Sequence, residues 1–260
     1  MHAISFVGSE RVARYVYGEA ARHGKRVQAA GGAKNHMVVM PDADLDHTIP
    51  GVLNSAFGNA GERCLAGSVT VAVGEVGREL LERLEVETRA LKVGPGDQPG
   101  VDVGPLIRED HRRAVKDYIR RGVEEGARLL VGGQELDLPG YFLTPAILDG
   151  VHMPMTVARD EIFGPVLAVS YARDLGDAIA QANAGRYGNM ATIFTSSGAS
   201  AREFRDRVEA GMVGVNVGVA QPFAFYPFSG WRASFFGDLH LHGQDGIEFF
   251  TRKKMAITRW

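Results

Sequence analysis

Cysteine is nearly absent from this sequence, since Cys64 is the only one among its 260 residues. A single cysteine excludes a disulfide within the chain and is compatible with a reducing cytoplasm. Long apolar runs are missing as well. No stretch of about 18 apolar residues could cross a membrane, and no signal peptide opens the sequence. From these absences we expect a cytoplasmic protein.

An excess of charge of one sign is also lacking, because 29 Lys and Arg residues stand against 31 Asp and Glu residues, for a net charge of −2. This balance gives no indication of binding to nucleic acid or to an anionic membrane. The 8 histidines show no spacing typical of a metal site, so no metal is expected. An apolar fraction of 45% is ample for a core, and the length suits one large domain or two small ones.

The stretch around Cys64 carries the strongest chemical signal in the chain. A thiolate is the strongest nucleophile that a protein carries near neutral pH, and a neighbouring cation such as Arg63 lowers its pKa. Apolar spacing predicts a helix over residues 42–57, and residues 68–73 are typical of a strand. Because glycine and asparagine lie between them, Cys64 is predicted on a turn with a free backbone N–H. The alternative is that Cys64 is only a small buried apolar residue.

Residues 1–30 predict a strand–helix–strand unit, with strands at 3–7 and 25–29 and a helix at 10–23 that has Ser9 as its N-cap. The junction at Gly8 and Ser9 would point free N–H groups at a phosphate, although most such junctions only connect a sheet to its helix. A parallel strand buried on both faces needs neighbours. We therefore expect the rest of this sheet to be missing from the sequence.

From residue 31 onward, helix and strand signals alternate, which favours an α/β fold. Helices are predicted at 78–89, 109–125, 174–184 and 199–209, and strands at 37–40, 128–131, 166–171, 190–194 and 212–216. Turn residues predict an exposed loop at 92–100, and residues 218–242 are typical of an aromatic-rich loop. Residues 247–260 are predicted to form a final extended arm.

Five segments together resemble the aldehyde dehydrogenases and occur in the order seen in that family: Phe6-Val7-Gly8-Ser9, Gly31-Gly32-Ala33-Lys34, Gly61-Glu62-Arg63-Cys64, Glu161-Ile162-Phe163-Gly164-Pro165 and Gly214-Val215-Asn216. The resemblance covers essentially the whole chain but only the C-terminal half of the family. It implies an α/β catalytic domain with an open, mostly parallel sheet and flanking helices. The implied domains are the end of a Rossmann-like NAD-binding domain at 1–31, the catalytic domain at 32–232, and a C-terminal loop and oligomerisation arm at 233–260.

The resemblance also implies a mechanism centred on Cys64. Its thiolate would attack an aldehyde, and its backbone N–H would bind the oxyanion. Arg63 would bind a substrate carboxylate, a role that suits a planar bidentate guanidinium. The alternative for Arg63 is a structural tie across the turn.

Five further residues match cofactor-binding positions of the family. Glu161 matches the residue that holds the nicotinamide ribose, and Phe163 matches the aromatic residue that packs near the nicotinamide. Gly8 and Ser9 match the turn near the cofactor phosphates, and Gly31 would offer its carbonyl near the carboxamide. The alternatives are that Glu161 is an ion-pair partner and that Phe163 belongs to the core.

One departure from the family pattern favours an acylating reaction. Members that hydrolyse their thioester carry a glutamate base where this sequence has Ala30, which cannot take a proton from water. A thioester on Cys64 would then persist until coenzyme A attacks it. The segments 32–36 and 228–238, together with Arg63, look like the methylmalonate-semialdehyde dehydrogenase branch of the family.

Three functional hypotheses follow from the sequence. The first is NAD- and CoA-dependent oxidation of malonate or methylmalonate semialdehyde to acetyl-CoA or propionyl-CoA, by a chain that lacks an N-terminal half and is inactive alone. The second is a hydrolytic aldehyde dehydrogenase with broad substrates, which Ala30 and Arg63 oppose. The third is a non-catalytic remnant that only joins an oligomer. Expected partners are the semialdehyde, further copies of the chain in a dimer or tetramer, and a complementary N-terminal half.

Overall fold

Seven strands form the main sheet, in the order β10-β9-β3-β4-β7-β6-β5. The computed structural model, which describes residues 1–260, shows that neighbouring strands are parallel except that β5 runs antiparallel to β6. The strands are β3 (Asn35–Val39), β4 (Gly67–Val73), β5 (Arg128–Val131), β6 (Ala146–Asp149), β7 (Val166–Ala172), β9 (Met190–Phe194) and β10 (Met212–Val215). The predicted open, mostly parallel sheet is confirmed.

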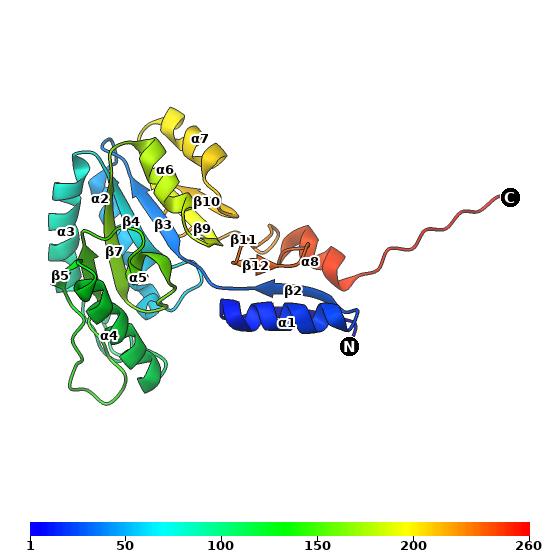
Figure 1. Cartoon of the computed structure of the whole chain (residues 1–260), viewed down its shortest axis with the longest axis horizontal. Coiled ribbons are helices and arrows are strands. Elements are labelled where there is room, and N and C mark those ends of the chain that lie inside the picture. The colour runs from blue at the N-terminus through cyan, green and yellow to red at the C-terminus, as the bar shows by residue number, and fades with distance from the viewer.

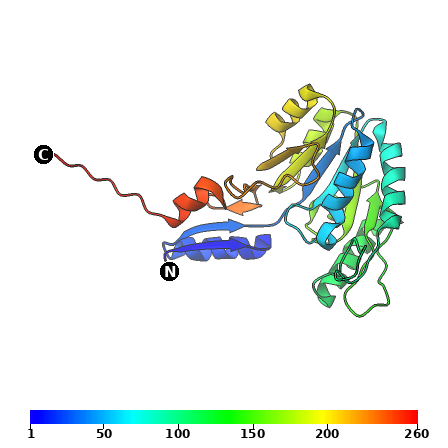
Figure 2. The same cartoon turned by 180° about the vertical axis from the view of Figure 1, so that it is seen from behind.

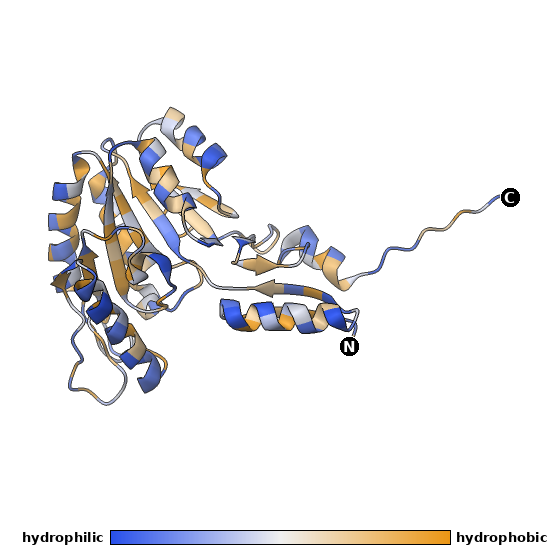
Figure 3. Cartoon of the chain, viewed as in Figure 1, coloured by the Kyte–Doolittle hydropathy of each residue, from blue (hydrophilic) through white to orange (hydrophobic).

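Helices cover both faces of this sheet (Figures 1 and 2). One face carries α2 (Leu45–Phe57) and α3 (Val76–Ala90); the other carries α4 (Glu109–Glu124), α5 (Thr156–Arg159), α6 (Leu175–Asn183) and α7 (Gly198–Arg207). Because both faces are covered, the central strands are mostly apolar, and Figure 3 shows them largely as orange ribbon apart from the polar beginning of β3. The core therefore lies between the sheet and its two helical layers.

A smaller sheet stands beside the main one (Figure 1). Its order is β1-β2-β12, with β1 (Ala3–Val7) parallel to β2 (Arg26–Ala30) and β12 (Phe235–Phe236) antiparallel to β2. Helix α1 (Glu10–Arg22) connects the two parallel strands, which confirms the predicted strand–helix–strand unit. Ser9 occupies the N-cap position of α1 as predicted, but its side chain makes no capping hydrogen bond.

The C-terminal region differs from the predicted extended arm. A helix, α8 (Gly243–Phe250), includes the first residues of that arm, and only the residues beyond it extend away from the body (Figures 1 and 2). The physical reason is packing against β2. The ring of Phe249 is 3% exposed and lies under the Arg26 guanidinium, which also donates to the carbonyls of Glu248 and Thr251. Between the two sheets, β8 (Tyr187–Gly188) pairs with β11 (Trp231–Arg232).

No helix in the structure combines the length and the apolar character that crossing a membrane requires.

Gly61 gives a test of the turn that follows α2. Its φ of +72° is left-handed, and an added Cβ would collide with the backbone of Gly164 and Pro165. We expect Gly61→Ala to lower the free energy of unfolding, measured by urea denaturation, by about 1–3 kcal/mol. The matched control is Gly18→Ala within α1, where a new Cβ meets nothing within 4 Å. That change should raise stability by about 0.5–1 kcal/mol. Equal effects of the two substitutions would contradict this account of the turn.

Candidate active site

Cys64 lies on the first central position of a tight turn between α2 and β4. The turn spans Arg63 to Ala66 and is closed by a 3.0 Å hydrogen bond from the Ala66 N–H to the Arg63 carbonyl. Left-handed backbone at Asn59 and Ala60, with φ of 52° and 54°, turns the chain away from α2 before this point. The Cys64 side chain is exposed, so the predicted turn placement is confirmed and the buried alternative is wrong.

The charge environment of the thiol differs from the expectation based on Arg63. Although the side chain is exposed, the protein atoms around the sulfur remove part of its water, and this partial desolvation raises the pKa of the Cys64 thiol above its ordinary value. The backbone N–H groups of Cys64 and Leu65 lower this pKa, and Arg63 lowers it by less than either of them. Arg63 thus lowers the thiol pKa as predicted, but loss of water around the sulfur outweighs it, so the net shift of the pKa is upward.

The guanidinium of Arg63 is held against the end of α2. Its Nη2 donates to the carbonyls of Asn54 and Ser55, the second at 3.1 Å, while Nε is buried without a partner. A Cβ at Gly58 would lie 2.8 Å from the same Nη2, so glycine leaves the space in which the guanidinium sits. Arg63 thus ties the turn to the helix, and its unpaired Nε and its Nη1 retain donors for a ligand.

Glu161 lies on the loop between α5 and β7 and faces the segment after β2. Its Oε1 accepts a 2.9 Å hydrogen bond from the Ala33 N–H. A Cβ at Gly32 would lie 2.7 Å from Oε2 and 2.9 Å from the Tyr187 ring, so only glycine allows this approach. Burial raises the pKa of Glu161 to about 7, although the Ala33 N–H and the Lys34 ammonium oppose the increase.

Phe163, two residues further along this loop, has an unusual backbone for a bulky residue. Its φ is +55°, and its side chain is 41% exposed, so the alternative of a core residue is wrong. His111 Nε2 lies 2.7 Å from the Phe163 carbonyl and holds the loop to α4. A bulky residue in left-handed backbone is a strained feature of the kind that clusters at functional sites.

A cleft of about 640 Å³ brings the beginning of α1 to Glu161. Ser9, Glu161 and Tyr187 line this cleft, together with Glu10, Arg11, Arg14, Tyr15, Tyr118, Asp160 and Arg186. Arg63, Glu161 and Phe163 line a second, narrow crevice of about 20 Å³. Glu161 lines both cavities. It therefore lies between the predicted phosphate-binding residue Ser9 and the predicted residues Arg63 and Phe163.

Gly8 and Gly31 support this cleft through the backbone without lining it. The Gly8 N–H donates to the Ala30 carbonyl at 3.1 Å, and the Gly31 N–H donates to the Ser234 carbonyl at 2.9 Å. A Cβ at Gly31 would lie 2.5 Å from the Ala233 carbonyl oxygen, so glycine is required there. Both glycines thus hold β2 against its neighbours.

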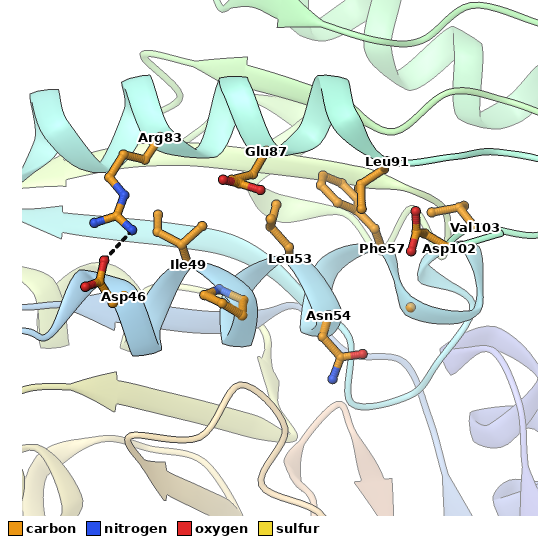
Figure 4. Close-up of a pocket in the computed structure, with 12 residues that line it drawn as sticks. Asp46, Ile49, Leu53, Asn54, Phe57, Arg83, Glu87, Leu91, Asp102 and Val103 are labelled. Atoms are coloured by element: carbon orange, nitrogen blue, oxygen red, sulfur yellow. Dashed lines mark hydrogen bonds and ion pairs between the residues drawn. The ribbon is translucent and has the colours of Figure 1, made fainter. Parts of the chain in front are cut away.

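A separate groove of about 420 Å³ runs between α2 and α3 (Figure 4). Leu53 and Phe57 point into it from α2, and the 2.7 Å ion pair between Arg83 and Asp46 closes one end. Asn54 lines the groove, and its carbonyl also accepts a hydrogen bond from Arg63. The groove is therefore next to the C-terminal end of α2. It does not include Cys64.

Three residues of the site were not predicted from the sequence. Asn35 and Asn189 donate to the carbonyl of Cys64, and Lys34 is buried with an unpaired Nζ. Burial lowers the pKa of Lys34 to about 8, which Glu161 partly opposes. The sequence did contain a signal that could have identified the two asparagines. Each is a polar residue at the start of an apolar strand, since Asn35 begins β3 and Asn189 directly precedes β9.

Comparison with known proteins places this geometry in a family. Residues 1–256 match the model of the aldehyde dehydrogenase family. Malonate-semialdehyde dehydrogenase from Halalkalibacterium halodurans is 50% identical over 260 residues, and malonate-semialdehyde dehydrogenase 1 from Geobacillus thermodenitrificans is 52% identical over 261. Each alignment covers 99% of this chain and 54% of the relative. The chain therefore spans about half the length of the curated relatives that it matches.

Solved structures agree with the sequence relatives. Methylmalonate-semialdehyde dehydrogenase from Oceanimonas doudoroffii superposes with a TM-score of 0.98 at 43% identity, covering 100% of this chain and 54% of that one. An aldehyde dehydrogenase from Mycobacterium tuberculosis, solved in complex with NAD+, gives a TM-score of 0.92 at 34% identity, covering 98% of this chain and 52% of that one. This chain belongs to the aldehyde dehydrogenase family.

Proposed function

We propose that this chain carries the thioester-forming half of a CoA-acylating semialdehyde dehydrogenase. Its substrate would be malonate or methylmalonate semialdehyde, and its product acetyl-CoA or propionyl-CoA. The observation that carries the proposal is the arrangement at Cys64, an exposed thiol on a tight turn between α2 and β4 whose pKa is lowered by the backbone N–H groups of Cys64 and Leu65. Such N–H groups stabilise negative charge on the sulfur and on an adjacent oxyanion. The names of the two semialdehyde dehydrogenase relatives and of the Oceanimonas structure support the substrate class.

The residues around the larger cleft fit NAD. Glu161 Oε1 is occupied by the Ala33 N–H, which leaves Oε2 for a ribose hydroxyl. The Ser9 hydroxyl is free of the capping bond that its position usually makes, so it can donate to a phosphate. Gly32 keeps the space beside Oε2 open, since any Cβ would fill it. When bound, NAD supplies the acceptor for the hydride of the aldehyde carbon.

The chain's own residues then divide the reaction into two parts. Cys64 sulfur bonds to the aldehyde carbon, and the backbone N–H of Cys64 donates to the oxygen as it becomes an anion. After loss of hydride the acyl group remains on Cys64 as a thioester. The thiolate of CoA attacks its carbonyl carbon and the Cys64 thiolate leaves. The bond between the α-carbon and the β-carboxylate breaks to release carbon dioxide, and the electron pair left on the α-carbon takes up a proton from water.

Ala30 supports transfer to CoA over hydrolysis. It is a buried residue of β2, paired with Val7 on β1 and with Phe235 on β12. A methyl side chain cannot accept a proton from water, so this position offers no base for hydrolysis of the thioester. The acyl group then stays on Cys64 long enough for a second thiol to bind.

Arg63 is the proposed contact of the substrate carboxylate. Both of its hydrogen bonds within the chain come from Nη2, so Nη1 keeps its donors for a carboxylate. Because the relatives are about twice as long as the matched region, we propose that a complementary segment supplies the remaining cofactor contacts and a second oxyanion donor. We also propose that the complete assembly is a homo-oligomer.

A coupled assay tests the proposed reaction. Chain 1–260 is assayed alone and mixed with the separately expressed first half of a Geobacillus relative, with malonate semialdehyde, NAD and CoA. We expect NADH and acetyl-CoA in equal amounts, and a rate about a hundredfold or more higher in the mixture, the size of a missing oxyanion donor. Cys64→Ser should abolish both products. CoA-independent NADH formation would favour hydrolysis instead, and a folded but inactive mixture would favour the non-catalytic hypothesis.

The pH dependence of Cys64 alkylation tests the thiol environment. The thiolate is the reactive form, so the rate with iodoacetamide rises with pH and reports the thiol pKa. Because burial raises the pKa of Cys64, the midpoint should lie above about 8.5, the value for a free thiol. The measured rate belongs to Cys64 alone, since the chain contains no other cysteine that could react. A midpoint below 8 would show that Arg63 outweighs burial after all.

Arg63→Ala tests the carboxylate contact in whichever preparation turns over. A hydrogen bond to a charged group of roughly 1.5–3 kcal/mol predicts a fall in kcat/KM for malonate semialdehyde of about ten- to a hundredfold. Propanal, which lacks the carboxylate, should be affected much less. An equal fall in kcat/KM for both aldehydes, accompanied by a lower melting temperature, would show that Arg63 only stabilises the turn by its contact with the end of α2.

A further inference from the structure

The carbonyl of Cys64 is held by two side-chain amides. Asn35 Nδ2 donates to it at 3.0 Å and Asn189 Nδ2 donates to it at 2.8 Å. A carbonyl oxygen has two lone pairs, so both are used by these donors. The two asparagines are 2% and 6% exposed, which makes these hydrogen bonds part of the protein interior.

The two amides reach Cys64 from different strands of the main sheet. Asn35 begins β3, and its Nδ2 also donates to the Ala66 carbonyl at 2.8 Å. Its Oδ1 accepts from the Met190 N–H at 3.0 Å, so Asn35 links the turn to β9. Asn189 stands directly before β9, and the bond to Cys64 is the only hydrogen bond that its side chain makes. The turn is thereby fixed from both sides of its carbonyl.

Holding this carbonyl also fixes the group at the other end of the same peptide. The carbonyl of Cys64 and the N–H of Leu65 belong to one planar unit and point in opposite directions. With the oxygen directed inward at the two amides, the Leu65 N–H is directed outward, toward the side of the turn where the Cys64 side chain is exposed. Hydrogen bonds to a carbonyl also polarise its peptide and strengthen donation by the N–H, since bonded chains are cooperative.

We propose that Asn35 and Asn189 are positioning residues that orient the Cys64–Leu65 peptide, so that the Leu65 N–H donates to the sulfur of Cys64. The inference rests on the proposed function, in which that sulfur is the nucleophile. The amides touch neither substrate nor cofactor and act through the peptide alone. Their role is to favour the thiolate at a sulfur whose partial desolvation disfavours it.

Asn189→Leu is the substitution that tests this role. Leucine is close to asparagine in size and carries neither a donor nor a charge, and Asn189 makes no other hydrogen bond that its removal would break. The readout is the pH profile of Cys64 alkylation by iodoacetamide, recorded with circular dichroism and melting temperature on the same samples. We expect the midpoint to move upward and the rate at pH 7.5 to fall about three- to tenfold, the size of one hydrogen bond.

The matched control is Asn183→Leu. Asn183 also bonds to backbone on both sides, donating to the Arg207 carbonyl at 2.9 Å and accepting from the Glu209 N–H at 2.8 Å, but it does not contact the Cys64 turn. The Asn183→Leu substitution should leave the midpoint pH of Cys64 alkylation unchanged even if the melting temperature falls. Asn189→Ala serves as a second, smaller variant and should give the same upward shift, so the inference stays testable if the leucine variant does not fold.

A folded Asn189 variant with the wild-type midpoint overturns the inference and leaves the amides a purely structural role. Alkylation needs no aldehyde, NAD or CoA, so this outcome is separate from failure of the proposed reaction. A shifted midpoint in a protein without dehydrogenase activity would uphold the positioning role and reject only the proposed function.

Discussion

The parallel alignment of four neighbouring strands determines where the candidate site lies. In the order β9-β3-β4-β7, each strand begins at the same edge of the sheet. Asn189 precedes β9, Asn35 begins β3, Cys64 precedes β4, and the Phe163 loop precedes β7. Residues far apart in the sequence therefore meet at one edge because parallel strands share their direction. The hydrogen bonds from Asn35 and Asn189 to Cys64 are direct consequences of this register.

The site uses the edge opposite to the one that open α/β sheets usually offer. Ligands of such sheets commonly bind outside the carboxyl ends of the strands. Here polar groups at that end bond to one another, since Thr195 Oγ1 donates to Asp42 at 2.8 Å and the Thr195 N–H donates to Asn216 at 2.9 Å. At the amino edge, in contrast, the Arg63 Nε and the Lys34 Nζ remain unpaired. Two of the buried donors without a protein partner thus lie at the edge that carries Cys64.

Local patterns in the sequence were sufficient to predict the turn at Cys64 and most of the helices and strands. They were not sufficient to predict which residues from different elements contact each other. The glycine and asparagine residues before Cys64 predicted a turn, and several strand and helix bounds agree within two or three residues. The strand β6 and the helix α5 were missed, and their length of four residues is not the reason, since β5 and β10 are equally short and were predicted. The contact of Asn189 with Cys64 spans 125 residues of sequence, so it depends on strand order, which periodicity does not encode.

The charge state of the site follows from burial more than from any ion pair. Burial raises the pKa of Glu161 to about 7 and lowers that of Lys34 to about 8, and it raises that of the Cys64 thiol. An ionised Glu161 raises the pKa of Cys64 further, so the two groups oppose each other's ionisation. As the pH rises through 7, the charge gained by Glu161 therefore makes the thiolate harder to form, which leaves the backbone N–H groups beside the sulfur as its main compensation.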